Sequence, residues 1–396
     1  MFLCPSRSRR WALHSVWDIE RLAIPHAING VKYAKKLHGS STRRQEKSTA
    51  PHRPRVIFSG IQPTGIPHLG NYFGALANWV KLQREADPSD ELIFSVVGWH
   101  ALTLPQDPKA LQTARMDMIA LILAVGIDPK RSIVFHQDHV QNHTELAWIL
   151  SCSTPVGRLR RMTTWKSRLA VSRNANDESE IDDSLLNAGL LTYPVLQAAD
   201  ILAYRATHVP VGDDQQQHLE LCRDIADTFN RAYKQPSTLF PLPHHMYTPT
   251  RRVLSLKDTS AKMSKSAVDV NSRVVLTDTA AQIKAKIRGA TTDSIQGITY
   301  DPVNRPGTSN LLLLLAACTD EDVDEVAKRY ANKNHGDLKA DVSQAIEEAF
   351  KGPRSEFERL RGETEYLLRI AEQGAAKAQE RSDATMKEVR KRIGLA

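Results

Sequence analysis

The chain has 396 residues, of which 41% are hydrophobic and 25% charged, a composition typical of a globular protein with two or three domains. No apolar run is long enough to cross a bilayer, and the richest one, Leu311–Cys318, predicts a buried helix, so no membrane association is expected. The four cysteines include no C-x-x-C pair, which argues against a disulfide framework or a metal site and fits reduced thiols inside the cell.

The net charge of +8 comes from the first 54 residues, which contain 11 basic and three acidic residues. The rest of the chain has no net charge. The basic pI of the whole chain therefore reflects its first 54 residues and is no argument that the body of the protein binds RNA. With an apolar and basic segment around Trp11–Leu37, residues 1–54 have the composition of a leader that directs import into the mitochondrial matrix. A disordered extension or a wrongly assigned start is the alternative, and a secretory signal is disfavoured because no sustained apolar stretch follows the first basic residues.

From residue 55 to about 275 the pattern predicts an α/β domain. Strand patterns occur at Val56–Phe58, Leu92–Val97 and Ser132–Phe135, with helical patterns between them at Asn71–Glu85 and Lys109–Ala124. This alternation predicts a Rossmann-like, doubly wound parallel sheet whose ligands sit at the carboxyl ends of the strands. Residues 141–190 are predicted to be a helical insertion, with helices at Thr144–Cys152 and Leu159–Leu169 and a polar, acid-rich loop at 172–183.

The loop after the first strand is rich in glycine and proline. Gly60 and Gly65 allow a sharp turn and a close approach to a ligand, and Pro67 suits the first turn of a helix. His68 and Asn71 would share one face of that turn. A helix start with small residues and neutral donors can hold phosphate or nucleotide, although an ordinary strand–loop–helix corner is also compatible with this pattern.

Three polar residues lie on one face of a helix that is otherwise apolar. Tyr193, Gln197 and Asp200 stand at positions i, i+4 and i+7. Buried polar groups need partners, so these residues form either a satisfied core network or a pocket for an amphipathic ligand. A carboxylate there could accept a hydrogen bond from an indole N–H or a phenol O–H and would disfavour ligands without that donor.

Two further segments carry polar residues after predicted strands. Gly212-Asp213-Asp214-Gln215 follows an apolar strand and could hold ribose hydroxyls or an ammonium group, and His218 and Glu220 are expected to continue an exposed helix start. His136, His139 and His143 lack a fourth ligand and are interpreted as surface or network residues, so no metal site is predicted.

The segment Lys262-Met263-Ser264-Lys265-Ser266 places two cations in a short loop that could close on a polyphosphate. Lysines there would stabilise charge that develops on an α-phosphate and on leaving pyrophosphate. Beyond this loop, residues 276–396 predict a separate, all-helical domain, with breaks at Gly289, Pro302–Pro306, Gly336 and Pro353.

Taken together, these motifs resemble those of bacterial and mitochondrial tryptophanyl-tRNA synthetases, which are class I aminoacyl-tRNA synthetases, over the chain from about Arg55 to its end. The matching pieces are SGIQPTG…HLGNYFGA, LLTYP…AADIL, VPVGDDQ…QHLEL and KMSKS. The resemblance implies Mg-ATP as a substrate with no tightly bound cofactor, tRNA and L-tryptophan as partners, a homodimer and a tryptophanyl-adenylate intermediate. Charge stabilisation and positioning would carry the reaction.

The resemblance also implies roles for individual residues. The expected catalytic residues are His68, Asn71, Lys262 and Lys265. The expected ATP-binding residues are Gln62, Pro63, Thr64, Gly70, Asn71, Gly212, Asp213, Asp214, Val253, Lys262, Met263, Ser264, Lys265 and Ser266. The expected tryptophan-binding residues are Phe58, Tyr193, Gln197, Asp200 and Gln215, with Asp200 accepting the indole N–H and Tyr193 and Gln215 near the ammonium group. The helical domain would contact the anticodon.

Gln197 departs from the family pattern, because bacterial members usually carry Met there. The Tyr193, Gln197 and Asp200 spacing also resembles tyrosyl-tRNA synthetases, in which the carboxylate would receive a phenol O–H. A small-molecule adenylyltransferase and a non-catalytic RNA-binding paralogue are further alternatives. The Asn-Tyr-Phe-Gly-Ala helix and the Gly-Asp-Asp-Gln run favour tryptophan.

Overall fold

The computed structural model describes residues 53–162, 164–173, 186–212, 215–234, 236–247, 252–265 and 267–396. Residues 53–396 form one compact unit. The predicted leader, apart from its last two residues, and most of the predicted polar loop at 172–183 lie outside the described residues, as do Asp213, Asp214 and Ser266. No helix in the described ranges combines the length and the apolar character needed to span a membrane.

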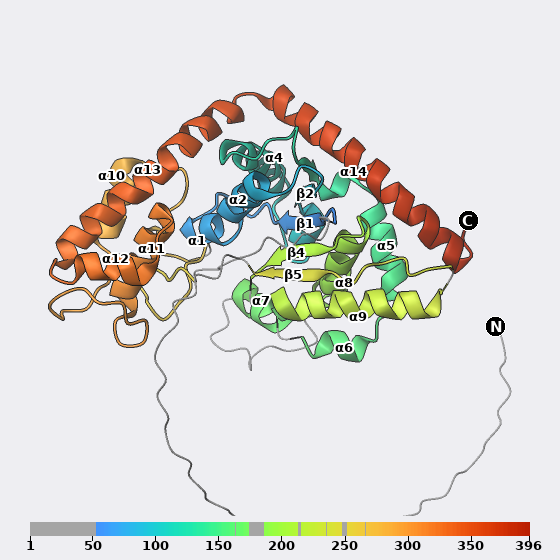
Figure 1. Cartoon of the computed structure of the whole chain (residues 1–396), viewed down its shortest axis with the longest axis horizontal. Helices are drawn as coiled ribbons and strands as arrows, with labels where there is room; N and C mark the ends of the chain where they lie inside the picture. The colour runs from blue at the N-terminus through green and yellow to red at the C-terminus, as the bar shows by residue number, and fades with distance from the viewer. Residues whose placement is uncertain are drawn as a thin grey trace, which may run out of the picture. The chain divides into compact units, whose positions relative to one another are not determined.

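A five-stranded parallel sheet forms the centre of the described chain, in the order β3-β2-β1-β4-β5 (Figure 1). Its strands are β1 (Val56–Ile61), β2 (Glu91–Val96), β3 (Ile133–His136), β4 (His208–Val211) and β5 (His244–Tyr247). The strand order reverses between β1 and β4, which is the arrangement of a Rossmann-like, doubly wound sheet and confirms the predicted fold class. The edge strand β5 was not predicted, because its sequence, His-His-Met-Tyr, lacks a β-branched apolar pattern.

Successive residues of the strands face two separate apolar cores. Ile57, Phe94 and Val134 belong to one core, and their chain neighbours Phe58 and Ile93 belong to the other. The first core also contains residues of α2 (Ala77–Glu85), α4 (Pro108–Ala124), α11 (Pro306–Thr319) and α13 (His335–Arg361), and the second contains residues of α5 (Asn142–Ser151), α8 (Ala188–Leu202) and α9 (Gln216–Ala232). Helices therefore cover both faces of the sheet, which explains why its strands are apolar throughout.

The predicted helix Leu159–Leu169 is wrong as a single element. The structure has α6 (Val156–Arg160) and α7 (Thr164–Arg173), because the chain turns at Arg161 and Met162. The predicted break at Pro353 is also wrong, because α13 runs through it. Apolar residues on both sides of the proline, such as Phe350 and Phe357, are fully buried, and this packing outweighs the lost hydrogen bond.

The expected buried helix at Leu311–Cys318 is confirmed as the central part of α11. The remaining helical elements are short or peripheral to the sheet: α1 (Leu69–Asn71), η1 (Tyr72–Leu76), α3 (Gly98–Ala101), η2 (Gln137–His139), η6 (Val270–Ser272), α10 (Ala280–Arg288) and α12 (Val323–Tyr330).

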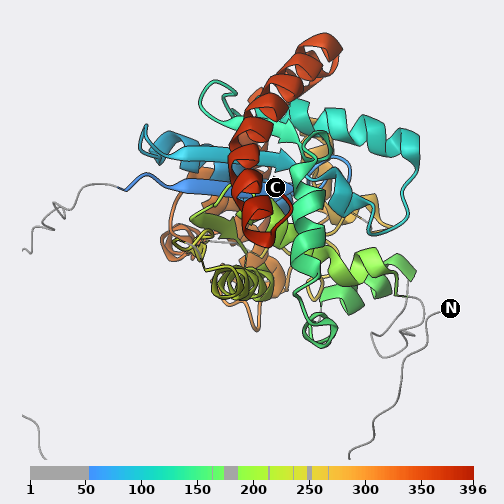
Figure 2. The same cartoon turned by 90° about the vertical axis from the view of Figure 1, so that its right-hand side faces the viewer.

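The last helix, α14 (Thr364–Ile393), packs on the strand at the edge of the sheet and not only on the other C-terminal helices. Figure 2 shows it crossing the strands, and Gly374 brings its backbone against β3, where an added Cβ atom would stand 1.8 Å from the Val134 carbonyl oxygen. Ion pairs from Arg381 to Glu91 and from Arg390 to Glu145 flank this contact. The C-terminal segment therefore packs more closely on the α/β domain than its helical pattern suggested, because α14 covers the edge of the sheet.

We predict that Gly374→Ala lowers the free energy of unfolding by about 1–3 kcal/mol, because the methyl group overlaps the β3 backbone. The matched control is Gly352→Ala, since Gly352 lies in the exposed middle of α13 with no atom within 4 Å of an added Cβ. That control should gain up to about 1 kcal/mol from helix propensity. Urea denaturation of both variants measures the difference, and equal effects would contradict the contact between α14 and β3.

Candidate active site

A cavity of about 280 Å³ lies where the strand order reverses. β1 and β4 pair at Ile57 and His208, near the start of both strands, whereas β1 pairs with β2 over six residues. Beyond that pair, Phe58 to Gly60 on β1 and Val209 and Pro210 on β4 line the cavity. The pocket therefore occupies the space opened by the reversal of strand order, as expected for a doubly wound sheet.

The helix after the first loop is interrupted by a π-helical turn, η1, between α1 and α2. At the end of this turn, the backbone amide of Ala77 donates to the carbonyl of Tyr72, five residues earlier. The Asn78 amide donates to the carbonyls of Phe73 and Gly74 at 3.2 Å each, which satisfies backbone groups in this turn. Gly74 and Asn78 both line the cavity, so the π-turn shapes one wall, a common use of this irregularity. The prediction of one regular helix at Asn71–Glu85 missed it.

His68 and Asn71 hold the start of that helix through a reciprocal cap. The His68 Nδ1 atom accepts the Asn71 backbone N–H at 3.3 Å, and the Asn71 side chain accepts the His68 backbone N–H at 3.4 Å. Burial lowers the pKa of His68 to about 4, assisted by the positive charges of Lys265, Lys262 and Arg273. His68 is therefore neutral at pH 7, which suits its acceptor role in the cap. The helix begins after His68, so Pro67 precedes the cap and is not in the first turn as predicted.

The predicted lysine loop meets the first loop. The Lys265 ammonium donates to the Gly65 carbonyl at 2.9 Å and to the Thr64 hydroxyl at 3.4 Å. Burial lowers the pKa of Lys265 to about 8. Lys262 is exposed on the same loop, whereas the Met263 side chain is buried in the core. The structure thus brings two motifs 200 residues apart in the chain into direct contact.

A C-terminal helix supports the lysine loop from behind. The Met263 amide donates to the Val253 carbonyl at 3.0 Å, and Leu254 bridges Lys262 in the same short antiparallel pair. The buried Asn310 side chain of α11 accepts the Leu254 amide at 2.9 Å and donates to its carbonyl at 3.2 Å. The Val253 side chain lies next to Gly70, where an added Cβ would stand 3.6 Å from it. Val253 and Gly70, both predicted to contact nucleotide, are therefore neighbours.

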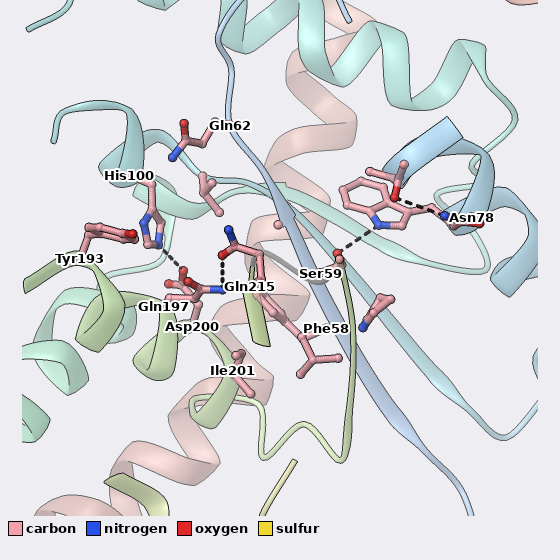
Figure 3. A pocket seen from close by; sticks show the side chains of 18 of the residues that line it. Phe58, Ser59, Gln62, Asn78, His100, Tyr193, Gln197, Asp200, Ile201 and Gln215 are labelled. Carbon is pink, nitrogen blue, oxygen red and sulfur yellow. Dashed lines mark hydrogen bonds and ion pairs between the residues drawn. The ribbon is translucent and has the colours of Figure 1, made fainter. Parts of the chain in front are cut away.

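Asp200 is almost fully buried and has three side-chain partners from three elements, of which Figure 3 shows His100. Its Oδ2 lies 2.8 Å from His100 Nε2, and its Oδ1 accepts the Gln137 amide at 2.7 Å and lies 2.7 Å from His143 Nδ1. Burial raises the pKa of Asp200, but the charge interactions and hydrogen bonds with His100 and His143 outweigh that effect and lower the pKa to about 2. The carboxylate is ionised at neutral pH and can only accept hydrogen bonds.

Counting lone pairs shows what Asp200 can still bind. Oδ1 has two partners, which fill its two acceptor positions, whereas His100 takes one position on Oδ2. Asp200 lines the cavity, so Oδ2 can accept one further hydrogen bond from a ligand there. Asp200 thus belongs to a buried hydrogen-bond network and also lines the cavity, while its role toward a ligand stays a prediction.

Next to Asp200, on the same face of α8 and at the start of α9, Tyr193, Gln197 and Gln215 also line the cavity (Figure 3). The Gln197 amide donates to the Gln215 side-chain oxygen at 3.4 Å, and the Arg168 guanidinium lies 4.4 Å from the centre of the Tyr193 ring. The expectation that His218 continues an exposed helix start is wrong. His218 is 1% exposed because the apolar face of α9 turns it inward, where it contacts all three of these residues.

Of the predicted site residues, the pocket contains Phe58, Gln62, Tyr193, Gln197, Asp200, Gly212 and Gln215. A second group surrounds the contact between the two loops: Thr64, His68, Gly70, Asn71, Val253, Lys262 and Lys265. Pro63, next to this group, is buried, and Ser264 is partly buried. Asp213, Asp214 and Ser266 lie outside the described residues, so their roles stay predictions.

Sequence reasoning missed the residues that support Asp200. Gln137 directly follows β3, and His100 lies in α3, four positions after the end of β2; this location at the carboxyl edge of the sheet is a signal that could have found them. His143 belongs to the network around Asp200, and its Nε2 atom lies 2.7 Å from the Tyr204 hydroxyl. His136 is buried and His139 is partly exposed. Within the described ranges, no cluster of three or more potential ligands is arranged to hold a metal ion.

Comparison with known proteins relates this site to a family. The family described as tRNA synthetases class I (W and Y) matches residues 50–351. The mitochondrial tryptophan–tRNA ligase of Schizosaccharomyces pombe is 43% identical over 88% of this chain and 97% of its own length. The mitochondrial tryptophan–tRNA ligase of Saccharomyces cerevisiae is 43% identical over 88% of this chain and 93% of its own length.

Among solved structures, the tryptophanyl-tRNA synthetase of Mycoplasma pneumoniae matches with a TM-score of 0.75 and 30% identity, over 87% of this chain and 99% of that one. The family match and these relatives extend over both predicted signature loops and the pocket. The chain therefore belongs to the class I tRNA synthetases of the tryptophan and tyrosine group.

Proposed function

We propose that this protein ligates L-tryptophan to tRNA(Trp) with ATP, through tryptophanyl-adenylate, in the mitochondrial matrix. The observation that carries this proposal is the buried, ionised Asp200 in a pocket at the switch point of the sheet. The relatives that share 43% identity are mitochondrial tryptophan–tRNA ligases, which supports tryptophan as the amino acid and mitochondria as the compartment. The basic leader supports import into the matrix.

The side chain of the amino acid enters between Phe58 and Ile201, and the indole N–H donates to Asp200 Oδ2. A ligand without this donor would leave a buried carboxylate acceptor unsatisfied, which is costly in a desolvated site. Tyr193, Gln197 and Gln215 then face the ammonium and carboxylate end. The cavity of about 280 Å³ suits one aromatic amino acid next to part of a nucleotide.

Mg-ATP lies along the first loop, with its phosphates between the start of α1 and the lysine loop. Gln62, Thr64, Gly70 and Asn71 contact the nucleotide, and Gly212 with Val253 borders the adenosine. A tryptophan carboxylate oxygen attacks the α-phosphorus, the bond to the bridging oxygen breaks, and pyrophosphate leaves. Lys262 and Lys265 stabilise the negative charge on the reacting phosphates, while His68 and Asn71 hold the loop in place.

The terminal 2′-hydroxyl of the tRNA then attacks the carbonyl carbon of the adenylate, and AMP is released. Residues 276–396 contact the anticodon. The protein acts as a symmetric homodimer through its catalytic domain. Large apolar side chains exposed next to α3, on α5 and at the start of α6 support such an interface: Leu102, Trp148 and Val156.

Pyrophosphate exchange into ATP by the full-length protein tests the choice of amino acid. We expect exchange with tryptophan and at least about 100-fold less with tyrosine, because the smaller phenol ring fills less of the pocket and holds its O–H donor at another position than the indole N–H. Exchange with tyrosine alone would assign the protein to the other half of the family. Exchange with neither would favour an adenylyltransferase or a non-catalytic RNA-binding role.

The lowered pKa of Lys265 predicts a pH dependence of ATP use. Lys265 is charged below its pKa of about 8 and loses its charge as the pH rises, so kcat/KM for ATP should fall about tenfold between about pH 7 and pH 9. Lys265→Arg should shift this fall to higher pH, because the guanidinium stays charged. The control is kcat/KM for tryptophan at saturating ATP, since bound phosphate keeps Lys265 protonated. A wild-type profile for ATP that stays flat to pH 9 would contradict the assignment.

Trp148 tests the dimer interface. Its side chain is 73% exposed on α5, so Trp148→Asp should convert dimers to monomers without lowering the melting temperature. Light scattering after size exclusion measures the mass. Val303→Asp is the matched control, because Val303 is also an exposed apolar residue, at 85%, but lies in the segment before α11. If Trp148→Asp remains dimeric, the interface lies elsewhere.

A further inference from the structure

His218 lies behind the pocket and does not line it, yet three of its partners do. Its Nδ1 atom is 2.9 Å from the Gln215 side-chain oxygen and 3.0 Å from the Gln197 side-chain oxygen. Its Nε2 atom is 2.7 Å from the Thr164 hydroxyl and 3.1 Å from the Tyr193 hydroxyl. One buried ring thus connects α7, α8 and the start of α9.

The partners determine the protonation of the ring. Two amide oxygens face Nδ1, and oxygens can only accept, so Nδ1 carries the proton. Two hydroxyls face Nε2, which in the neutral ring has one lone pair and accepts from one of them at a time. Thr164 supplies the closer hydroxyl to Nε2 and Tyr193 the more distant one.

The same geometry determines the orientation of both glutamine amides. An amide that flipped would turn its NH₂ group toward the Nδ1–H group, so two donors would face each other and the hydrogen bond would be lost. The Gln197 amide nitrogen instead donates to the Gln215 oxygen, which places both side chains in one consistent arrangement (Figure 3). A polar wall that could adopt several arrangements is thereby held in one before the ligand arrives, which lowers the cost of binding.

We propose that His218 is a positioning residue for amino-acid recognition. Through Nδ1–H it fixes the amide orientations of Gln197 and Gln215, and its Nε2 lone pair accepts from the Thr164 or the Tyr193 hydroxyl. It affects the affinity for the amino acid without touching it. This inference rests on the proposed function, in which the pocket takes tryptophan.

Two substitutions separate the two sides of the ring in the full-length protein. His218→Asn keeps an N–H at the position of Nδ1, whereas His218→Gln places its amide near the position of Nε2 and loses the donor to the glutamines. In tryptophan-dependent pyrophosphate exchange, we expect His218→Gln to raise KM for tryptophan about tenfold and KM for ATP less than about twofold. His218→Asn should stay within about threefold of the wild type for both substrates.

A merely structural role would raise both KM values together or affect both variants equally, and either result would overturn the inference. If the wild type itself shows no exchange with tryptophan, the proposed function fails and the inference fails with it. Exchange by the wild type with an unchanged KM for tryptophan in His218→Gln would overturn the inference alone.

A second measurement is read from the wild type and uses a variant only to assign the signals. Nitrogen-15 NMR of the labelled imidazoles, with the His218 signals identified by their loss in His218→Asn, reports which ring nitrogen carries the proton. We expect a proton on Nδ1 and none on Nε2 at neutral pH. A proton on Nε2 alone would exclude the proposed orientation of the amides.

Discussion

The site depends on a charge that is kept in the protein interior. A buried carboxylate is tolerated only when its oxygens are satisfied by well-placed donors, and Asp200 receives them from His100, Gln137 and His143. These three residues follow β2, follow β3 and lie on α5, while Asp200 itself belongs to α8. The requirement to satisfy one charge thus ties together two strand ends and two helices. The same requirement leaves one acceptor position of Oδ2 for a ligand, so the stability of the pocket and its specificity have one physical cause.

The two signature loops depend on parts of the chain that lie far from them in sequence. Lys265 contacts the first loop, but the short ladder that carries the lysine loop is held by Asn310 of α11. The helix α14 packs on β3, and its Ser382 and Asp383 accept hydrogen bonds from Asn142, the neighbour of His143. The C-terminal helices therefore contact the supports of both halves of the site. Any movement of these helices on tRNA binding would change the hydrogen bonds of Asn310 behind the lysine loop and those of Asn142 next to His143, a partner of Asp200.

Two neighbouring groups of polar residues behind the cavity are organised differently, one around Asp200 and one around Gln197 and Gln215. On the side of Asp200 the partners are buried donors that stabilise a negative charge, and their number limits what the carboxylate can still accept. On the side of Gln197 and Gln215 the groups are neutral, and the issue is orientation, because an amide can present either its oxygen or its nitrogen. His218 supplies the directional donor there. Both groups are thus arranged before a ligand binds.

The sequence by itself determined the strand–helix alternation, the two loops and the polar face of α8, because these are local patterns in which residue spacing reports which side chains share a face. It also located most of the pocket, since parallel strands end at one edge of a sheet. It failed at Pro353 and His218, because packing against distant residues overrode a local preference in the first case and buried an apparently exposed position in the second. Only the tertiary structure decided which donors reach Asp200, that η1 shapes a wall, and that α14 closes the edge of the sheet. Those contacts join residues up to some 240 positions apart, and no local pattern encodes such pairs.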